Sequence, residues 1–136
     1  KGMAETVAPY MPAEEQIRSC RWLPDDELRV YSAEYRRTGF QGGLQWYRCG
    51  TDPRYRRELQ VFADRTLDVP SAFIAGQRDW GVYQVPGTFE RMQETACTDM
   101  RRCTLVEGAG HWVQQERPER VTELLRAFLD DGATRS

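Results

Sequence analysis

Residues 69–80 read VPSAFIAGQRDW, and residues 103–112 read CTLVEGAGHW. Each stretch holds a short apolar run that ends near a glycine, which is typical of a strand buried on both faces of a sheet. We therefore expect strands over 72–75 and 103–106. A helical pattern covers 86–96, and another begins at Pro118. The order strand, helix, strand, helix predicts a parallel sheet covered by helices, the α/β class.

The pattern from Pro118 has the apolar stripe of an amphipathic helix that ends near residues 130–132. That stripe comprises Val121, Leu124, Leu125, Phe128 and Leu129. Two strands are too few for a sheet of this kind, since its strands need neighbours on both sides. We therefore expect the chain to be the C-terminal portion of a larger α/β domain.

The residues before this α/β portion are predicted to be helical. Helices are expected over 12–20, 24–39, 44–49 and 53–62, with a loop at Gly42-Gly43. Acidic residues after Pro24 favour a helix start, and Gly39 favours its end. The predicted organisation is a helical segment over residues 1–66 and an α/β segment over residues 67–136.

Composition restricts the kind of protein. The 136 residues suit one soluble globular domain, with 40% hydrophobic and 29% charged residues. The net charge of −2 predicts neither a nucleic-acid nor an anionic-lipid partner. No apolar run approaches the roughly 18 residues of a membrane span, so no membrane association is expected.

The cysteines and the single histidine argue against a metal centre. Cys20, Cys49, Cys97 and Cys103 form no C-x-x-C pair, so neither zinc nor another cofactor is expected. Free thiols in the reducing cytoplasm are the favoured interpretation. Spacing leaves a Cys97–Cys103 disulfide open.

Two polar residues follow the predicted strands. Asp79 comes after the first strand and His111 after the second, about 30 residues later, which is one strand–helix–strand unit. Because sites in open α/β sheets form at the carboxyl ends of strands, both side chains are expected at one edge. A carboxylate beside imidazole holds the ring's tautomer and leaves the other nitrogen as a general base. Taken singly, Asp79 could cap a turn and His111 could be a structural histidine.

These residues resemble a known family. Residues 69–80 are similar to the acid-bearing strand and loop of α/β-hydrolases, and GAGHWVQQE at 108–116, followed by Pro118, resembles their histidine loop and last helix. Residues 39–48, GFQGGLQWYR, are similar to the end of the cap domain in epoxide hydrolases. The resemblance covers residues 23–129 and implies the C-terminal part of an α/β-hydrolase fold, with a cap remnant before it.

The resemblance also implies a mechanism. In that family an aspartate attacks a ring carbon of the epoxide, two cap tyrosines assist ring opening, and a His–Asp pair activates water to hydrolyse the ester. Carried over by motif, Asp79 is the charge-relay acid, His111 the base and Tyr47 one ring-opening tyrosine. Trp46, Trp80 and Trp112 become candidates for the wall of an apolar pocket. Tyr47 and the tryptophans have ordinary packing as an alternative.

No nucleophile motif is found. Neither Gly-x-Ser-x-Gly nor Gly-x-Asp-x-x-Gly after an apolar run is present. The isolated chain is therefore expected to be inactive unless the N-terminal half of the hydrolase is supplied in trans. The open apolar edge of the strand near 72–75 predicts self-association or pairing with that missing half.

Several functions remain open on these residues. A small apolar epoxide or ester is the expected substrate, and an epoxide hydrolase-like activity is the leading hypothesis. A haloalkane or haloacid dehalogenase of the same fold does not need Tyr47. A serine esterase or peptidase differs at the nucleophile, and a non-catalytic interaction module needs neither Asp79 nor His111.

Overall fold

The computed structural model describes residues 2–133. The chain forms two compact units, which meet in the sequence between Gly39 and Phe40. The boundary that the sequence predicts after residue 66 between a cap-derived and an α/β segment stays a prediction. Within the described range, no helix combines the length and the apolar character needed to cross a membrane.

The first unit consists of helices joined by turns. Its elements are α1 (Met3–Val7), the 3₁₀ turn η1 (Ala8–Tyr10), α2 (Glu14–Arg18) and α3 (Asp25–Thr38). The helix expected over 12–20 is therefore shorter than predicted, and α1 was not predicted at all. Helices of about five residues bury little apolar surface and leave a weak periodic signal.

Helix α3 follows its predicted bounds closely. Three acidic residues occupy its first turn and two arginines its last, so both ends complement the helix dipole. Gly39 ends it with a φ of 71°, and the Gly39 N–H donates to the Tyr35 carbonyl at 2.8 Å. This left-handed conformation favours glycine, which explains why the helix ends where the sequence predicts.

The second unit begins with α4 (Gln41–Thr51) and α5 (Arg56–Leu59). The loop predicted at Gly42-Gly43 is wrong, because both glycines lie inside the first turn of α4. The Leu44 N–H donates to the Phe40 carbonyl at 3.0 Å and closes a helical turn over them. The helix expected over 53–62 is confined to α5, with turns around it.

The α/β part has the predicted order, with additional short helices. Its elements are β1 (Ser71–Gly76), α6 (Trp80–Tyr83), α7 (Thr88–Arg91), the π-helical turn η2 (Met92–Ala96), β2 (Met100–Val106), α8 (Val113–Glu116) and α9 (Pro118–Ala133). The single helix expected over 86–96 begins later, because Gly87 has a φ of 78° and cannot be part of it. It also changes to π geometry, with the Cys97 N–H donating to the Met92 carbonyl at 2.9 Å.

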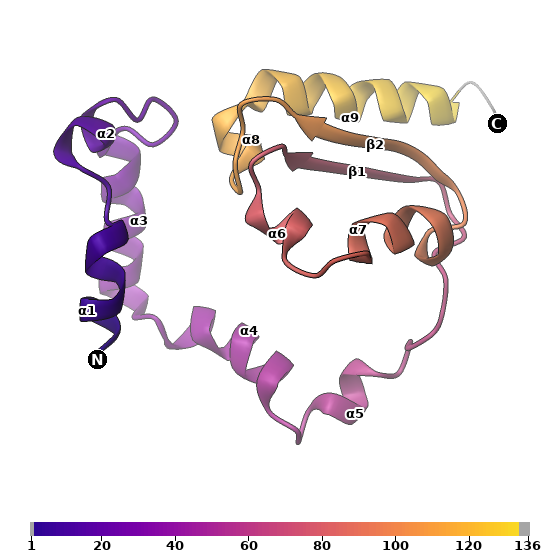
Figure 1. Ribbon diagram of the computed structural model, residues 1–136, viewed down its shortest axis with the longest axis horizontal. Coiled ribbons are helices and arrows are strands. Elements are labelled where there is room, and N and C mark those ends of the chain that lie inside the picture. Colours follow the sequence, from indigo (N-terminus) through magenta and orange to yellow (C-terminus); the bar gives the residue numbers. More distant parts are fainter. Residues whose placement is uncertain (1, 134–136) are drawn as a thin grey trace. The chain divides into compact units, whose positions relative to one another are not determined.

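Strands β1 and β2 form a two-stranded parallel sheet, as predicted, with Ala72 opposite Arg102 and Gly76 opposite Val106. Helix α9 lies along one face of this sheet, and α6 and α7 lie along the other (Figure 1). Successive strand residues point to opposite faces. Accordingly, Ile74 packs against the α9 side, while the Phe73 ring meets Phe89 on α7 with ring centroids 5.7 Å apart.

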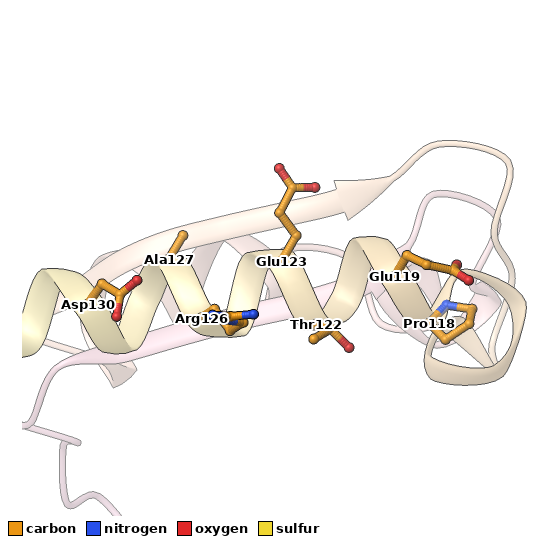
Figure 2. Close-up of a pocket in the computed structure, with 7 residues that line it drawn as sticks. All are labelled: Pro118, Glu119, Thr122, Glu123, Arg126, Ala127 and Asp130. Atoms are coloured by element: carbon orange, nitrogen blue, oxygen red, sulfur yellow. The ribbon is translucent and has the colours of Figure 1, made fainter.

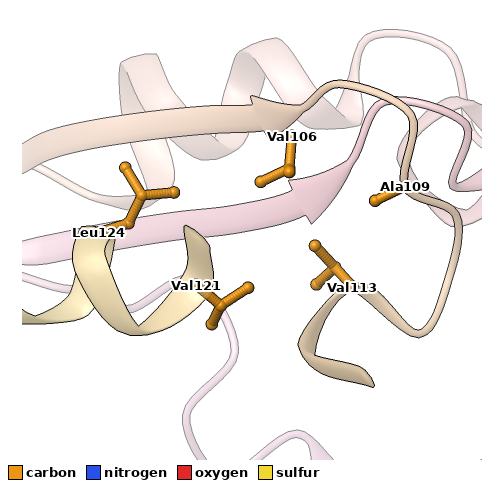
Figure 3. Packing of buried hydrophobic residues seen from close by; sticks show 5 residues of the cluster. All are labelled: Val106, Ala109, Val113, Val121 and Leu124. Carbon is orange, nitrogen blue, oxygen red and sulfur yellow. The ribbon is translucent and has the colours of Figure 1, made fainter. Parts of the chain in front are cut away.

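The buried core lies between the sheet and α9, close to the ends of both strands. Figure 3 shows its five side chains converging there: Val106, Ala109, Val113, Val121 and Leu124. Ala109 is fully buried although it belongs to the loop after β2. The core is therefore continuous with the loop that carries His111, so packing fixes the start of that loop.

Candidate functional site

The first side of the site is the turn that follows β1. Asp79 is the N-cap of α6, and its Oδ1 accepts a hydrogen bond from the Gly81 N–H at 2.8 Å. Aspartate is a preferred N-cap because its carboxylate satisfies an otherwise unpaired helix N–H. The capping role considered in the sequence is therefore real. It also fixes the direction of the carboxylate.

The second side is the loop that follows β2, and main-chain hydrogen bonds hold it against the first. The Gln77 N–H donates to the Val106 carbonyl, and the Arg78 N–H donates to the Ala109 carbonyl, both at 2.9 Å. A Cβ on Gly76 would collide with the backbone of Ala109 and Gly110. A glycine at position 76 therefore permits the close approach of the two loops.

These loops bring Asp79 and His111 together. The His111 Nδ1 lies 2.9 Å from the Asp79 Oδ1, within hydrogen-bond distance. The His111 side chain is 48% exposed and that of Asp79 14% exposed. The carboxylate therefore lies beneath the imidazole, and the ring faces the surface. The sequence expectation that both side chains meet at the carboxyl-end edge of the sheet is confirmed.

The electrostatics favour an ionised Asp79. Partial burial acts to raise the pKa of this carboxyl group, but the hydrogen bonds from His111 and from the Gly81 N–H outweigh it and hold the pKa below its ordinary value. An ionised carboxylate can only accept, so a neutral His111 must carry its proton on Nδ1. Its Nε2 is then a free lone pair that can accept a proton.

Two indole rings flank the imidazole. Trp80 stacks on His111 with centroids 5.6 Å apart and an interplanar angle of 25°. Trp112 meets the same ring edge-on at 5.1 Å and 73°. Both indoles are exposed. They restrict rotation of the imidazole and give the mouth of the site an aromatic character.

The structure does not bring Tyr47 and Trp46 to this pair. Both lie on α4, where their side chains are 69% and 81% exposed. In residues 2–133, no hydrogen bond or ring contact joins either side chain to Asp79 or His111. Their assignment to a site therefore rests on the sequence motif.

One residue of the site escaped the sequence reasoning. Glu116, the last residue of α8, accepts hydrogen bonds from the N–H groups of Gly110 and Trp112, which flank His111. Its signal in the sequence is an acidic residue five positions after the histidine. That spacing allows a side chain to reach back over one helical turn.

Two hollows of the surface are lined by residues other than the pair. An open hollow of about 710 Å³ is lined by side chains of α9 between Pro118 and Asp130, and Figure 2 shows them along that helix. A smaller hollow of about 260 Å³ lies between β1, α6 and α7 and includes Phe73 and Val82. Neither is lined by Asp79 or His111. Across the described residues, no three metal-ligating side chains cluster.

The four cysteines carry free thiols in the structure, so Cys97 and Cys103 are not bridged. Cys97 is buried. Burial raises the pKa of the Cys103 thiol above its ordinary value, which disfavours the reactive thiolate. Cys97 and Cys103 therefore have the character of structural cysteines.

Comparison with known proteins gives consistent matches. Epoxide hydrolase A of Mycobacterium tuberculosis is 42% identical in an alignment 113 residues long that covers 79% of this chain and 32% of that protein. The crystal structure of epoxide hydrolase A from Mycobacterium thermoresistibile matches 82% of this chain with a TM-score of 0.70 and 40% identity, over 33% of its own length. Potato epoxide hydrolase I matches 89% of this chain with a TM-score of 0.69 and 27% identity, over 41% of its length.

No family model matches the sequence. The chain spans about a third of the length of epoxide hydrolase A and of epoxide hydrolase B of Mycobacterium tuberculosis.

Proposed function

Because the chain has the sequence and the fold of the C-terminal portion of an epoxide hydrolase-like α/β-hydrolase, we propose that it supplies the water-activating half of an epoxide-opening active site. The single observation that carries this proposal is the hydrogen bond between His111 and Asp79. The proposed substrate is a small apolar epoxide, and the product is the corresponding diol.

His111 acts as the general base for water. Asp79 holds the Nδ1 proton, which leaves the lone pair on Nε2 in a ring that is half-exposed. When Nε2 takes a proton, the ring becomes a cation, and the ionised Asp79 stabilises it at hydrogen-bond distance. The lowered pKa of Asp79 supports this role, because the carboxylate stays charged throughout.

The step that His111 assists is hydrolysis of a covalent ester. An aspartate nucleophile, which this chain lacks, first attacks a ring carbon and forms a hydroxyalkyl ester. Water then loses a proton to His111 Nε2, and its oxygen bonds to the carbonyl carbon of that ester. The acyl C–O bond, between the carbonyl carbon and the ester oxygen, breaks, and the departing alkoxide takes the proton back from His111. The diol leaves. The carboxylic acid left on the nucleophile gives up its proton, which replaces the one that the epoxide oxygen took during ring opening, and the carboxylate is restored.

Tyr47 assists the first step. The epoxide oxygen gains negative charge as its C–O bond breaks, and a phenol can donate a hydrogen bond or a proton to it. The Tyr47 side chain is exposed on α4, so it is available to a substrate. The sequence motif around it, Trp46-Tyr47-Arg48, supports the assignment.

The tryptophans form the proposed apolar walls of the site. Trp80 and Trp112 already contact the His111 ring and leave much of their own surface exposed. An apolar epoxide therefore meets indole faces next to the base. Trp46 is proposed to serve the same pocket from α4.

Activity requires residues outside this chain. The acid and the base are present without a nucleophile, so we propose that the chain alone is inactive and that it works with the N-terminal half of the hydrolase. Assays with and without that half, added in trans, test the proposal. Diol formation by the chain alone contradicts it.

The sheet supports the same proposal. In the described residues it contains only β1 and β2, so β1 presents an unpaired edge. Such an edge accepts another strand, either from the missing half or from a second copy of the chain. Sedimentation of the isolated chain is expected to show self-association that the missing half suppresses. A monomer unaffected by that half contradicts this expectation.

We place the protein in a reducing compartment such as the cytoplasm. Its support is the presence of four free thiols. Mass spectrometry of protein that is purified under non-reducing conditions and alkylated after unfolding, so that buried Cys97 can react, is expected to find all four cysteines modified. A stable disulfide contradicts this assignment.

The deciding experiment follows both steps in the complete protein. With styrene oxide, a His111→Gln variant is expected to form the ester and then stop, so that mass spectrometry detects a covalent adduct of the substrate. A Tyr47→Phe variant is expected to slow adduct formation instead. Undiminished steady-state turnover in His111→Gln overturns the role of the pair.

Parallel assays separate the alternatives. Halide release from a haloalkane without diol formation from an epoxide indicates a dehalogenase. Cleavage of a p-nitrophenyl ester with a modified serine indicates an esterase. Absence of all three reactions in the complete protein favours an interaction module.

A further inference from the structure

We propose that Glu116 is a positioning residue that holds the backbone on both sides of His111 and thereby fixes the direction of the imidazole. The inference rests on the proposed function, since it matters for catalysis only if His111 is the base. It concerns a side chain that touches neither Asp79 nor the ring itself.

The geometry is a two-point clamp. The Glu116 Oε2 accepts the Gly110 N–H at 2.8 Å, and its Oε1 accepts the Trp112 N–H at 3.1 Å. His111 is the residue between these two amides. Glu116 is itself half-buried and stands at the end of α8, one helical turn beyond the loop. Each carboxylate oxygen therefore has its own partner.

The chemistry of the clamp suits a carboxylate and no other side chain of this length. Both partners are N–H donors, and an ionised carboxylate is the acceptor-only group with two equivalent oxygens. Among the described residues neither N–H has another hydrogen bond. A hydrogen bond to a charged acceptor stabilises the fold more than a neutral one does. A partly buried N–H that is left without an acceptor costs further stability.

Gly110 is part of the same arrangement. A Cβ at this position would lie 3.2 Å from the Glu116 Oε1, which is tighter than ordinary side-chain contacts. A side chain at residue 110 would therefore press on the carboxylate and require it to shift. The small residues before His111 and the acidic residue after it therefore contribute to the same loop geometry.

Arg117 secures the start of the loop. Its Nη2 donates to the Gly108 carbonyl at 3.2 Å, and its Nη1 donates to the Glu116 carbonyl at 2.8 Å. Gly108 has a φ of 69°, which allows the sharp turn before the clamp. Neighbouring residues at the end of α8 therefore hold both the entry to the loop and the backbone around His111.

The consequence for catalysis is orientation. His111 is half-exposed, and its side chain is held by one hydrogen bond and two ring contacts. If the backbone on either side moves, the Nε2 lone pair turns away from the water it must activate. A misplacement of about 1 Å in such a group can lower a rate about 100-fold.

The first test is made on the chain itself and needs no activity. In ¹⁵N-labelled protein, the amide protons of Gly110 and Trp112 are expected to shift in step with the Glu116 carboxyl carbon as pH falls. In Glu116→Gln, which keeps only one acceptor oxygen, exchange of at least one of the two amides with solvent is expected to rise about tenfold or more. Wild-type amides that do not follow the carboxyl titration overturn the clamp even where a variant fails to fold.

A matched control and a conservative variant sharpen the result. Glu107 is exposed in the same loop and makes no side-chain hydrogen bond among the described residues, so Glu107→Gln is expected to leave both amides unchanged. Glu116→Asp keeps the charge but withdraws the carboxylate by one methylene, so it is expected to lose at least one of the two protected amides. Full protection in the aspartate variant shows that charge alone suffices and contradicts a two-point clamp.

The second test separates this inference from the proposed function. In the complete protein, Glu116→Gln is expected to lower the rate of ester hydrolysis about 10- to 100-fold while ester formation keeps its rate. Equal losses in both steps contradict a positioning role toward His111. If the complete protein opens no epoxide at all, the proposed function fails, and the amide measurements still decide whether Glu116 holds the loop.

Discussion

The Nδ1 atom of His111 lies 2.9 Å from the Oδ1 atom of Asp79, 32 positions away in the chain. The same oxygen accepts the Gly81 N–H at 2.8 Å, so the acid is oriented by its own helix before it meets the ring. The direction of the carboxylate is therefore set by α6 and the position of the ring by the loop after β2.

The substitution Asp79→Asn tests the orienting role of the acid. An asparagine can present its NH₂ group to Nδ1, which favours the tautomer with the proton on Nε2 and removes the base. Ester hydrolysis by the complete protein is expected to fall on the order of 10³- to 10⁴-fold, while ester formation is retained. Rapid-quench kinetics with detection of the covalent adduct measure both steps. An unchanged hydrolysis rate contradicts the assignment.

The pH dependence of stability tests the lowered pKa of Asp79. Because the pKa of this group is lower in the folded than in the unfolded chain, the stability it contributes is present above its unfolded value of about 3.9 and is lost as pH falls below that. The difference in unfolding free energy between wild type and Asp79→Asn is therefore expected to shrink as pH falls from about 5, roughly one unit above the unfolded value, to below that value.

Urea unfolding at several pH values measures this difference. The Arg54 side chain also lowers the pKa of Asp52, but that group is present in both proteins, so its contribution cancels. A difference that stays constant or grows at acid pH means that the pKa of Asp79 is not lowered.

Gly76→Ala tests the close approach of the two loops. An added Cβ would meet the carbonyl groups of Ala109 and Gly110, which are main-chain atoms and cannot rotate away. We expect a loss of about 1–3 kcal/mol in unfolding free energy. As the control, Gly43→Ala in α4 places a Cβ where nothing lies within 4 Å, and alanine favours a helix by about 0.5–1 kcal/mol. Urea titration of both variants is the measurement, and equal stabilities contradict the predicted collision.

Two leucines of α9 test the position of the core. Leu124 is 8% exposed and packs with Val121 and Val113, whereas Leu129 is 65% exposed. Leu124→Ala is expected to cost about 2–5 kcal/mol of unfolding free energy. Leu129→Ala is expected to change it by no more than about 0.5 kcal/mol in the isolated chain. Thermal and urea unfolding measure the contrast, and a reversed order places the core elsewhere.

The sequence predicts the long-range features of the α/β part well. Two apolar runs ending near glycine predict both strands, which the structure extends by one residue at each end of β1 and by three residues at the start of β2, and the stripe from Val121 to Leu129 identifies α9. Because parallel strands bring their carboxyl ends to one edge, the meeting of Asp79 and His111 follows from topology alone. These features depend on periodicity and on chain direction, both of which the sequence carries.

Short-range features are less predictable. Gly42 and Gly43 are typical loop residues, yet a main-chain hydrogen bond to Phe40 places them in a helix. Gly87 interrupts an otherwise helical pattern through its positive φ. The contacts of Glu116 escaped prediction because they are made with main-chain N–H groups, whose positions an acidic residue after the histidine does not reveal by itself.

The junction of the two loops also bears on how this surface can change. Gln77 and Arg78 hold the opposite loop through their main-chain N–H groups alone, and their side chains are exposed. Any residue except proline supplies the same donors. Substitutions at these two positions can therefore change the charge and size of the surface near the proposed site. They leave the main-chain hydrogen bonds, and with them the distance between Asp79 and His111, unchanged.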